Sequence, residues 1–254
     1  MYEENDAFEK PLNKDAKIWR FTDFPKFVSM IDEKKLFFVR VDKLQDKFEG
    51  TLSYADTKRE EEIYNKHNLE TPKHQCNWKL RKASKKWMVV NSWHINEYES
   101  AAMWKLHSRD GEGIAIQSTF NNLTKCFRTY AENPVFVGVV KYIDYERDEI
   151  PWRNFLYPFM YKRKSFEHEH ELRAAIFKFP QIIKKGTYES LDLKDEPLGA
   201  MGIGVPVDLD ILIQAVYLSP TSEDWIADLV KSTMDKYGLK KKLFKSSLKD
   251  KPLY

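Results

Sequence analysis

The stretch WMVVNSWHINEYESAAMW, residues 87–104, joins an apolar run to a helix-forming segment. Its first part, Trp87–Trp93, has the aromatic and β-branched side chains of a buried strand. Asn96 and Glu99 have the spacing of a capping box, which predicts a helix from Glu97 to His107. The junction between strand and helix therefore gathers Trp, His, Glu and Ser side chains, and we expect a site there.

The rest of the chain extends this pattern in both directions. Further strands are predicted at 18–21, 36–41, 113–119, 135–142, 172–179, 203–207 and 215–218. We expect 135–142 to be central in the sheet and 172–179 to have one wetter face. Helices are predicted at 25–34, 54–67 and 223–237. The class is α+β, a single mixed, mainly antiparallel sheet core with flanking helices, in one domain over 1–254 with a helical, basic insertion at about 52–86.

Composition limits the broad class of protein. The chain has 254 residues, of which 42% are hydrophobic and 32% charged, as in an ordinary globular protein. Two cysteines, Cys76 and Cys126, and a polar start indicate a reducing, cytoplasmic setting. No apolar run approaches the roughly 18 residues of a membrane span, so no membrane partner is expected. Aromatic residues reach 14%, which is explained either by a Phe- and Tyr-rich core or by rings that stack on bases or sugars.

The net charge of +3 is modest, but the positive charges are concentrated. A basic run lies between Trp78 and Trp87 and is a candidate nucleic-acid contact. Its members are Lys79, Arg81, Lys82, Lys85 and Lys86. The alternative is an ordinary solvated face.

A second dense patch, KRKSFEHEHELR at 162–173, contains more ionisable groups than a packed core is expected to accept. In an extended strand His168 and His170 would share one face, which raises the question of a metal. No zinc-ligand spacing, HExxH or EF-hand pattern is present, and no metal is expected. Glycine-rich phosphate loops are absent as well.

Several of these segments together resemble a known family. The segments 18–21, 36–40, 46–49, 93–104, 111–119 and 162–173 are similar to the bacterial domain-of-unknown-function family numbered twenty-nine seventy-one. The most specific parts are ESAAMW at 99–104 and KRKSFEHE at 162–169. This chain departs from the family at QDKFE, 45–49, where members read Asn-Asp-Pro-Phe-Glu. That family implies no activity.

The order of elements also resembles the ADP-ribosyltransferase-like proteins. These open with a strand that bears Arg or His, continue through a helix to a second strand, and place a catalytic Glu on a late strand. Arg20, Arg40 and Glu171 could fill those places. The resemblance implies NAD as a possible co-substrate.

The residue types suggest roles for glycosyl transfer. A carboxylate, Glu171 or Glu169, could stabilise an oxocarbenium-like sugar, with His94 as general acid and Glu99 as a further catalytic candidate. That carboxylate, whichever of the two it is, would point into a cleft floored by Trp93 and Trp104. Candidates for substrate binding are Arg20, Arg40, Trp93, Tyr98, Ser100, Trp104 and Arg163. Each has a structural alternative: ion pairing for the charged groups, core packing for the tryptophans and capping for Glu99.

Our first interpretation is an enzyme that acts on an N-glycosidic bond of NAD or of nucleic acid, with DNA the expected form, in a bacterial defence or toxin setting. One alternative is a glycosylase that excises a nucleobase and needs no NAD. Another is a non-catalytic nucleic-acid or protein binding module.

Overall fold

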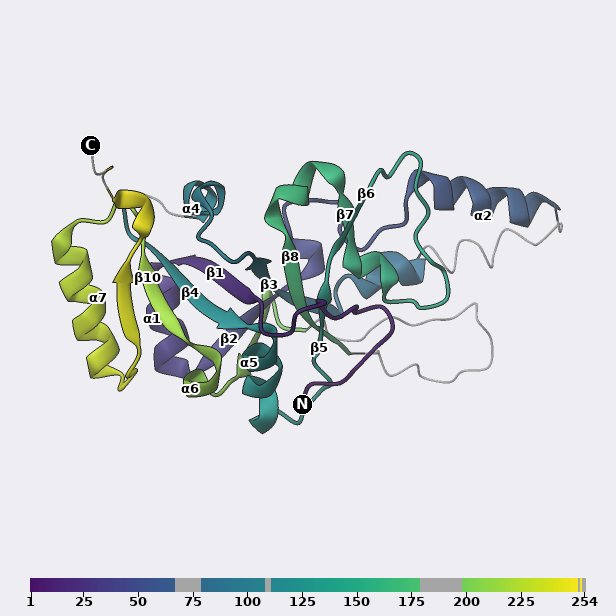
Figure 1. Ribbon diagram of the computed structural model, residues 1–254. Helices are drawn as coiled ribbons and strands as arrows, with labels where there is room; N and C mark the ends of the chain where they lie inside the picture. The colour runs from purple at the N-terminus through teal and green to yellow at the C-terminus, as the bar shows by residue number, and fades with distance from the viewer. Residues whose placement is uncertain (67–78, 108–110, 179–197, 251, 253–254) are drawn as a thin grey trace.

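The computed structural model describes residues 1–66, 79–107, 111–178, 198–250 and 252 (Figure 1). The strands are β1 (Lys17–Asp23), β2 (Lys35–Arg40), β3 (Met88–Ile95), β4 (Gly113–Thr119), β5 (Phe136–Val139), β6 (Lys141–Ile143), β7 (Tyr161–Arg163), β8 (Glu171–Phe177), β9 (Gly202–Pro206), β10 (Ala215–Leu218) and β11 (Lys242–Lys245). The α-helices are α1 (Phe24–Glu33), α2 (Tyr54–Lys66), α4 (Ala101–His107), α5 (Phe120–Lys125), α6 (Leu209–Leu212) and α7 (Asp224–Lys236). Short 3₁₀ helices are η1 (Val41–Lys43), η2 (Cys126–Thr129), η3 (Tyr157–Met160), η4 (Lys164–Glu169) and η6 (Ser247–Lys249).

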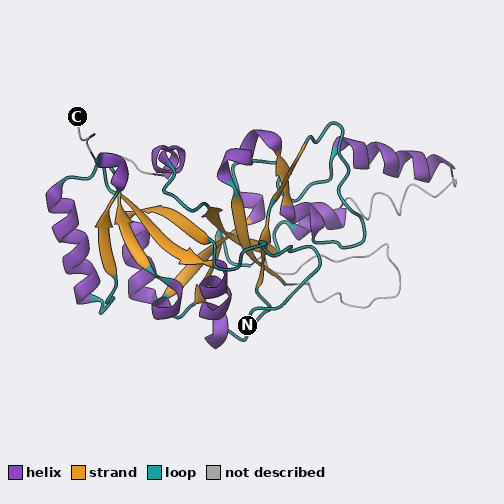
Figure 2. Ribbon diagram, in the orientation of Figure 1, coloured by secondary structure: helices purple, strands orange, loops and turns teal. Residues whose placement is uncertain are grey.

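The main sheet has the order β11-β10-β4-β1-β3-β2-β9, with β8 on β3 and β5 on β8. Of its pairs, β10 with β11 is parallel and the others are antiparallel. Figure 2 shows the strands running through the middle of the molecule, with helix α7 at the left end and α1, α5 and α6 in the lower part. The predicted α+β class with a mixed, mainly antiparallel sheet is confirmed.

Local sequence explains where the helices begin and which face they bury. Asp23 caps α1 by accepting from the Lys26 amide, and Pro25 stands in its first turn. Thr119 caps α5 in the same way. Helix α7 buries Ile226, Val230 and Met234, which are four residues apart and therefore share one face. These helices close the larger hydrophobic core on one side of the sheet.

Strand β3 is the branch point of the sheet. One of its edges pairs with β8 along the whole strand, from Met88 to His94. The other edge is shared: β2 pairs with Val89 and Val90, and β1 pairs only with His94 and Ile95. Residues 91–93 lie in the gap between β1 and β2, and Ser92 is exposed there although it stands in mid-strand. We call this place the β3 gap.

Four local predictions are wrong. Helix α4 begins at Ala101, not Glu97, because the Ser100 hydroxyl, rather than an Asn96 capping box, accepts the Met103 amide. Segment 135–142 is not central, since β5 lies off the main strand order and, in the described part of the chain, β8 is the one strand it pairs with. Strand β8 has no wetter face and is buried at every position. Residues 164–169 form η4 and His170 adopts a left-handed φ of 39°, so His168 and His170 do not alternate along a strand.

The predicted insertion is helical where it is described, in α2 and at 79–84, while 67–78 lie outside the described residues. In the part of the chain that the structure describes, every helix is too short or too polar to cross a bilayer.

Candidate functional site

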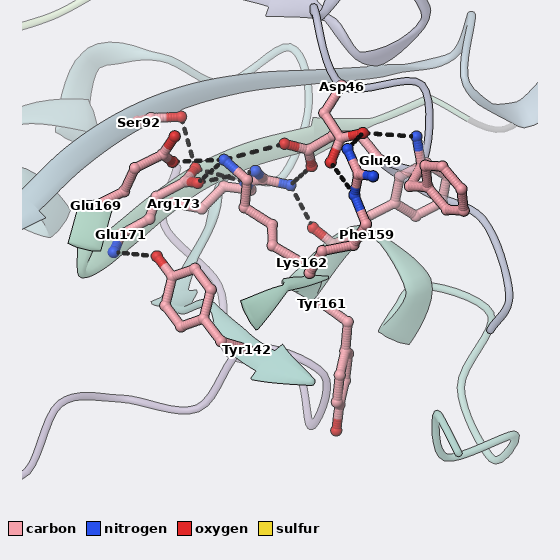
Figure 3. Close-up of polar contacts among 12 residues, drawn as sticks. Asp46, Glu49, Ser92, Tyr142, Phe159, Tyr161, Lys162, Glu169, Glu171 and Arg173 are labelled. Carbon is pink, nitrogen blue, oxygen red and sulfur yellow. Dashed lines mark hydrogen bonds and ion pairs between the residues drawn. The ribbon is translucent and has the colours of Figure 1, made fainter. Parts of the chain in front are cut away.

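Glu171 opens strand β8 and lies at the centre of a buried ion network (Figure 3). Its Oε1 accepts from the Ser92 hydroxyl at 2.6 Å and from Arg173 Nε at 2.7 Å. Its Oε2 accepts from Arg173 NH2 at 3.0 Å and from Lys162 Nζ at 3.1 Å. Both carboxylate oxygens are thus occupied, and the residue is 2% exposed.

Lys162 and Arg173 connect Glu171 to two further carboxylates. Lys162 Nζ lies 3.1 Å from Glu49 Oε1 and 2.5 Å from Glu169 Oε2. Arg173 NH1 lies 2.9 Å from Glu49 Oε2, in an ion pair without hydrogen-bond geometry. Three carboxylates thus face two cations, so the cluster has a net charge of −1 when all five groups are ionised. We call these five residues the ion cluster.

The cluster accommodates burial by pairing its charges. Burial by itself would raise the pKa of Glu171, but Arg173 and Lys162 outweigh it and hold that pKa at about 2. Burial would lower the pKa values of Lys162 and Arg173, and the carboxylates raise them instead. Of the ionisable groups in the patch at 162–173, Lys162, Glu171 and Arg173 are buried, and they are buried as ion pairs, whereas most of the others remain exposed.

Glu169 is the accessible carboxylate of the ion cluster. It ends η4, and its side chain is 26% exposed. Only Oε2 is held, by Lys162, and Oε1 has no hydrogen-bond partner among the described residues. The Glu169 carbonyl accepts from His94 Nδ1 at 2.6 Å, which anchors this end of η4 to β3. Because Glu171 has no open oxygen, Glu169 is the carboxylate that a ligand can reach.

Arg20 stands on β1, which lies on the edge of β3 opposite to β8. Its NH1 donates to the carbonyl of Ser92 at 2.8 Å, so the guanidinium reaches from β1 to the mid-strand position that β1 leaves unpaired. No carboxylate pairs with Arg20 among the described residues, and burial lowers its pKa to about 10, which still leaves it charged at neutral pH. A half-buried cation without an acidic partner is suited to a bound anion.

His94 is buried beside this place and is neutral at pH 7. Burial lowers its pKa, although the bond to the Glu169 carbonyl opposes this. With the proton on Nδ1, Nε2 faces the amide nitrogen of Asn96 at 3.4 Å and acts as an acceptor. Its ring contacts Phe21 and His170. His94 has no proton to give at Nε2, so its geometry does not fit a general acid.

The candidates around α4 have structural partners or lie at the surface. Glu99 accepts from Trp104 Nε1 at 3.0 Å and from the Ser247 amide at 3.0 Å, and so connects α4 to the C-terminal η6. Ser100 caps α4. Tyr98 is 80% exposed.

The two tryptophans do not floor a common cleft. Trp104 packs with Phe21 in a small cluster, whereas Trp93 packs in the main core. Along β3, Trp93 and Ser92 point to opposite faces of the sheet, so Trp93 is also on the face away from Glu171. Both indole rings are buried and are unavailable for stacking on a base.

Two predicted arginines are held by acidic partners. Arg40 forms a two-point ion pair with Asp42, 2.8 Å at each contact, and donates to the Gly199 carbonyl at 2.7 Å. Arg163 donates to Asp46 at 2.8 Å, and its guanidinium lies 4.4 Å from the centre of the Phe48 ring. Arg40 is buried and not available to a substrate, whereas Arg163 is partly exposed.

Only part of the basic run is exposed and available to contact nucleic acid. Lys79, Lys82 and Lys86 are exposed. Arg81 pairs with Glu60 at 3.2 Å, and Lys85 donates to the Lys47 carbonyl at 3.0 Å. Of the flanking tryptophans, Trp87 is buried, and Trp78 lies outside the described residues.

Reasoning from sequence missed Glu49, Lys162, Arg173 and Ser92 as site residues. The dense patch at 162–173 contained two of them, but its pairing with Glu49 and Ser92 needs contacts between distant segments. Among the described residues, no group of three or more His, Cys, Asp or Glu side chains could hold a metal ion. Cys126 is buried and free, and Cys76 is not among them.

Comparison with protein-family models gave no match, so the resemblance to the domain-of-unknown-function family has no support there. No curated protein matches either. A search of solved structures matched Thermus sp. 2.9 DarT in complex with carba-NAD+, at 8% identity and a TM-score of 0.36, over 91% of this chain and 96% of that one. Identity and TM-score this low do not establish a shared fold.

Proposed function

We propose that this chain is an enzyme that breaks the N-glycosidic bond of NAD and transfers the ADP-ribosyl group, with nucleic acid as the acceptor. The observation that carries the proposal is that two unlike groups are anchored close together on β3. Arg20, a cation without an acidic partner, is held by the Ser92 carbonyl, and Glu169, a carboxylate with one open oxygen, is held by His94. Ser92 and His94 are two residues apart on one strand, roughly 7 Å along it.

Arg20 suits the diphosphate of a dinucleotide. A guanidinium presents several N–H donors in a plane and binds phosphate oxygens at two points. Bringing Arg20 out of water without a counter-ion is unfavourable, and a bound phosphate would remove that cost. The bond to the Ser92 carbonyl fixes its direction before a ligand arrives.

Glu169 suits the sugar. When the bond between C1′ and the nicotinamide nitrogen breaks, the electron pair leaves with the nicotinamide and positive charge develops on the ribose. The open Oε1 of Glu169 and the net negative charge of the ion cluster would stabilise that charge. The acceptor then bonds to C1′ and its proton passes to the carboxylate or to solvent. Glu171, with both oxygens occupied, positions Lys162 and Ser92 in this proposal.

The test is mass spectrometry of the purified protein with NAD, with and without DNA, comparing wild type with Glu169→Gln. We expect nicotinamide release and a mass gain on the DNA, both reduced by about 100-fold or more in Glu169→Gln. Glu167→Gln is the matched control, because Glu167 is an exposed carboxylate on the same short helix with no ion pair among the described residues.

The other outcomes decide between the alternatives. Release of a free base without NAD would replace the transferase with a nucleobase-excising glycosylase. Salt-sensitive binding to nucleic acid without any product would leave a binding module. If the protein has a defence or toxin role, expression of the wild type should lower phage yield or slow growth, and expression of Glu169→Gln should do neither.

A further inference from the structure

A shallow pocket lies beside the ion cluster, since Arg163 and Lys164, which line it, directly follow Lys162. Its volume is about 300 Å³, at the lower end of the roughly 300–1,000 Å³ of small-molecule sites. Phe48, Tyr54 and Tyr145 supply aromatic walls. The Phe48 ring meets Tyr145 and Tyr54 edge to face, at centroid distances of 5.6 Å and 6.2 Å. Tyr54 remains 54% exposed, so much of its ring is free for a ligand.

The pocket presents charges of both signs. Arg163 lies over the Phe48 ring and is held in place by Asp46. Lys164 is exposed and forms no ion pair in the described part of the chain. Asp144 and Glu146 line the same pocket, and Asp144 lies 3.8 Å from Arg147 at the surface. A ligand here meets flat aromatic surface together with hydrogen-bond donors and acceptors.

We infer that this pocket binds an unpaired nucleobase of a nucleic-acid strand, an inference that rests on the proposed function because it locates the acceptor of that reaction. A base has a flat face for Tyr54 and an edge with both donors and acceptors for Asp144, Glu146 and Lys164. The exposed Lys164 suits the neighbouring phosphate.

The position of the pocket relative to Glu169 supports this assignment. Lys164 begins η4 and Glu169 ends it, so the two lie about 10 Å apart at the roughly 2.0 Å rise per residue of a 3₁₀ helix. The Asp46–Arg163 pair connects the pocket to the loop that carries Glu49. A base held by Tyr54 would bring the strand next to the carboxylate that handles the sugar.

The test is fluorescence anisotropy of a labelled single-stranded DNA with the full chain, without NAD, so that binding is measured apart from turnover. Tyr54→Ala should weaken binding by about 5- to 100-fold, the loss typical of one stacked base. Tyr54→Phe keeps the ring and should bind as wild type does. Trp225→Ala is the control, since Trp225 is 57% exposed on α7, at the opposite end of the molecule from α2 in Figure 1.

Lys164→Glu gives a second measurement, and it should weaken binding and lower its salt dependence. Equal binding by wild type and Tyr54→Ala, or no binding by wild type, would overturn the inference. A mononucleotide that competes as strongly as the strand would overturn the strand as ligand. Strand binding through Tyr54 without NAD turnover would support the pocket and refute the proposed reaction, whereas NAD turnover without such binding would refute the pocket alone.

Discussion

Replacing Glu171 with Gln should cost the protein much of its stability. The substitution keeps the shape of the side chain, but its amide nitrogen must face either Arg173 Nε and the Ser92 hydroxyl, or Arg173 NH2 and Lys162 Nζ, all of which now donate to the carboxylate. The pKa of Glu171 falls from its ordinary 4.5 to about 2, which corresponds to about 3 kcal/mol favouring the ionised native state. Breaking a buried ion pair typically costs about 3–5 kcal/mol.

Urea unfolding followed by tryptophan fluorescence at pH 7 measures this loss. We expect the free energy of unfolding of Glu171→Gln to fall by about 3–5 kcal/mol, and that of Glu169→Gln by about 1 kcal/mol or less, because Glu169 is partly exposed. The contribution of Glu171 is present above pH 4.5 and is lost as pH falls toward 2, since its folded pKa is lowered. Glu171→Gln should therefore destabilise less at low pH.

A Glu171→Gln protein that is as stable as wild type but loses turnover would refute this reasoning. It would mean that Glu171 is a reacting group rather than an anchor of the ion cluster. If Glu169→Gln were instead less stable than Glu171→Gln and fully active, Glu169 would be the anchor of the ion cluster and Glu171 the reacting group.

Three further predictions concern other parts of the site and fold. Arg20→Ala should raise the Kd for NAD by about 10-fold or more, measured by calorimetry. Arg20→Lys should recover only part of the lost affinity, because the two-point geometry of the guanidinium is lost. His94→Gln should remove a loss of stability that wild type shows as pH falls through 6.5, because burial lowers the pKa of the native imidazole and the unfolded state takes up the proton first. Gly202→Ala should lower the melting temperature by several degrees, since φ is +152° and a Cβ would lie 2.0 Å from the Phe38 carbonyl oxygen.

Sequence alone determined the class and most of the elements. The apolar run at 87–93 became the branch strand β3, and the helices predicted at 25–34 and 223–237 are α1 and α7. These features depend on residues a few positions apart, which is why periodicity and capping predict them. Arg20 and Glu169 were among the side chains chosen from the sequence, but their surroundings were not predicted, and their roles stay a prediction.

Only the tertiary structure decided which charges are buried and which carboxylate is open. Glu49 and Ser92 come from segments distant in sequence, and they contact Lys162, Glu171 and Arg173, the three charged residues of the 162–173 patch that are buried. The exposure of Ser92 depends on the strand order, because β1 and β2 share one edge of β3 and neither pairs with Ser92. An ion's environment is set by everything that packs around it, and no local pattern contains that information.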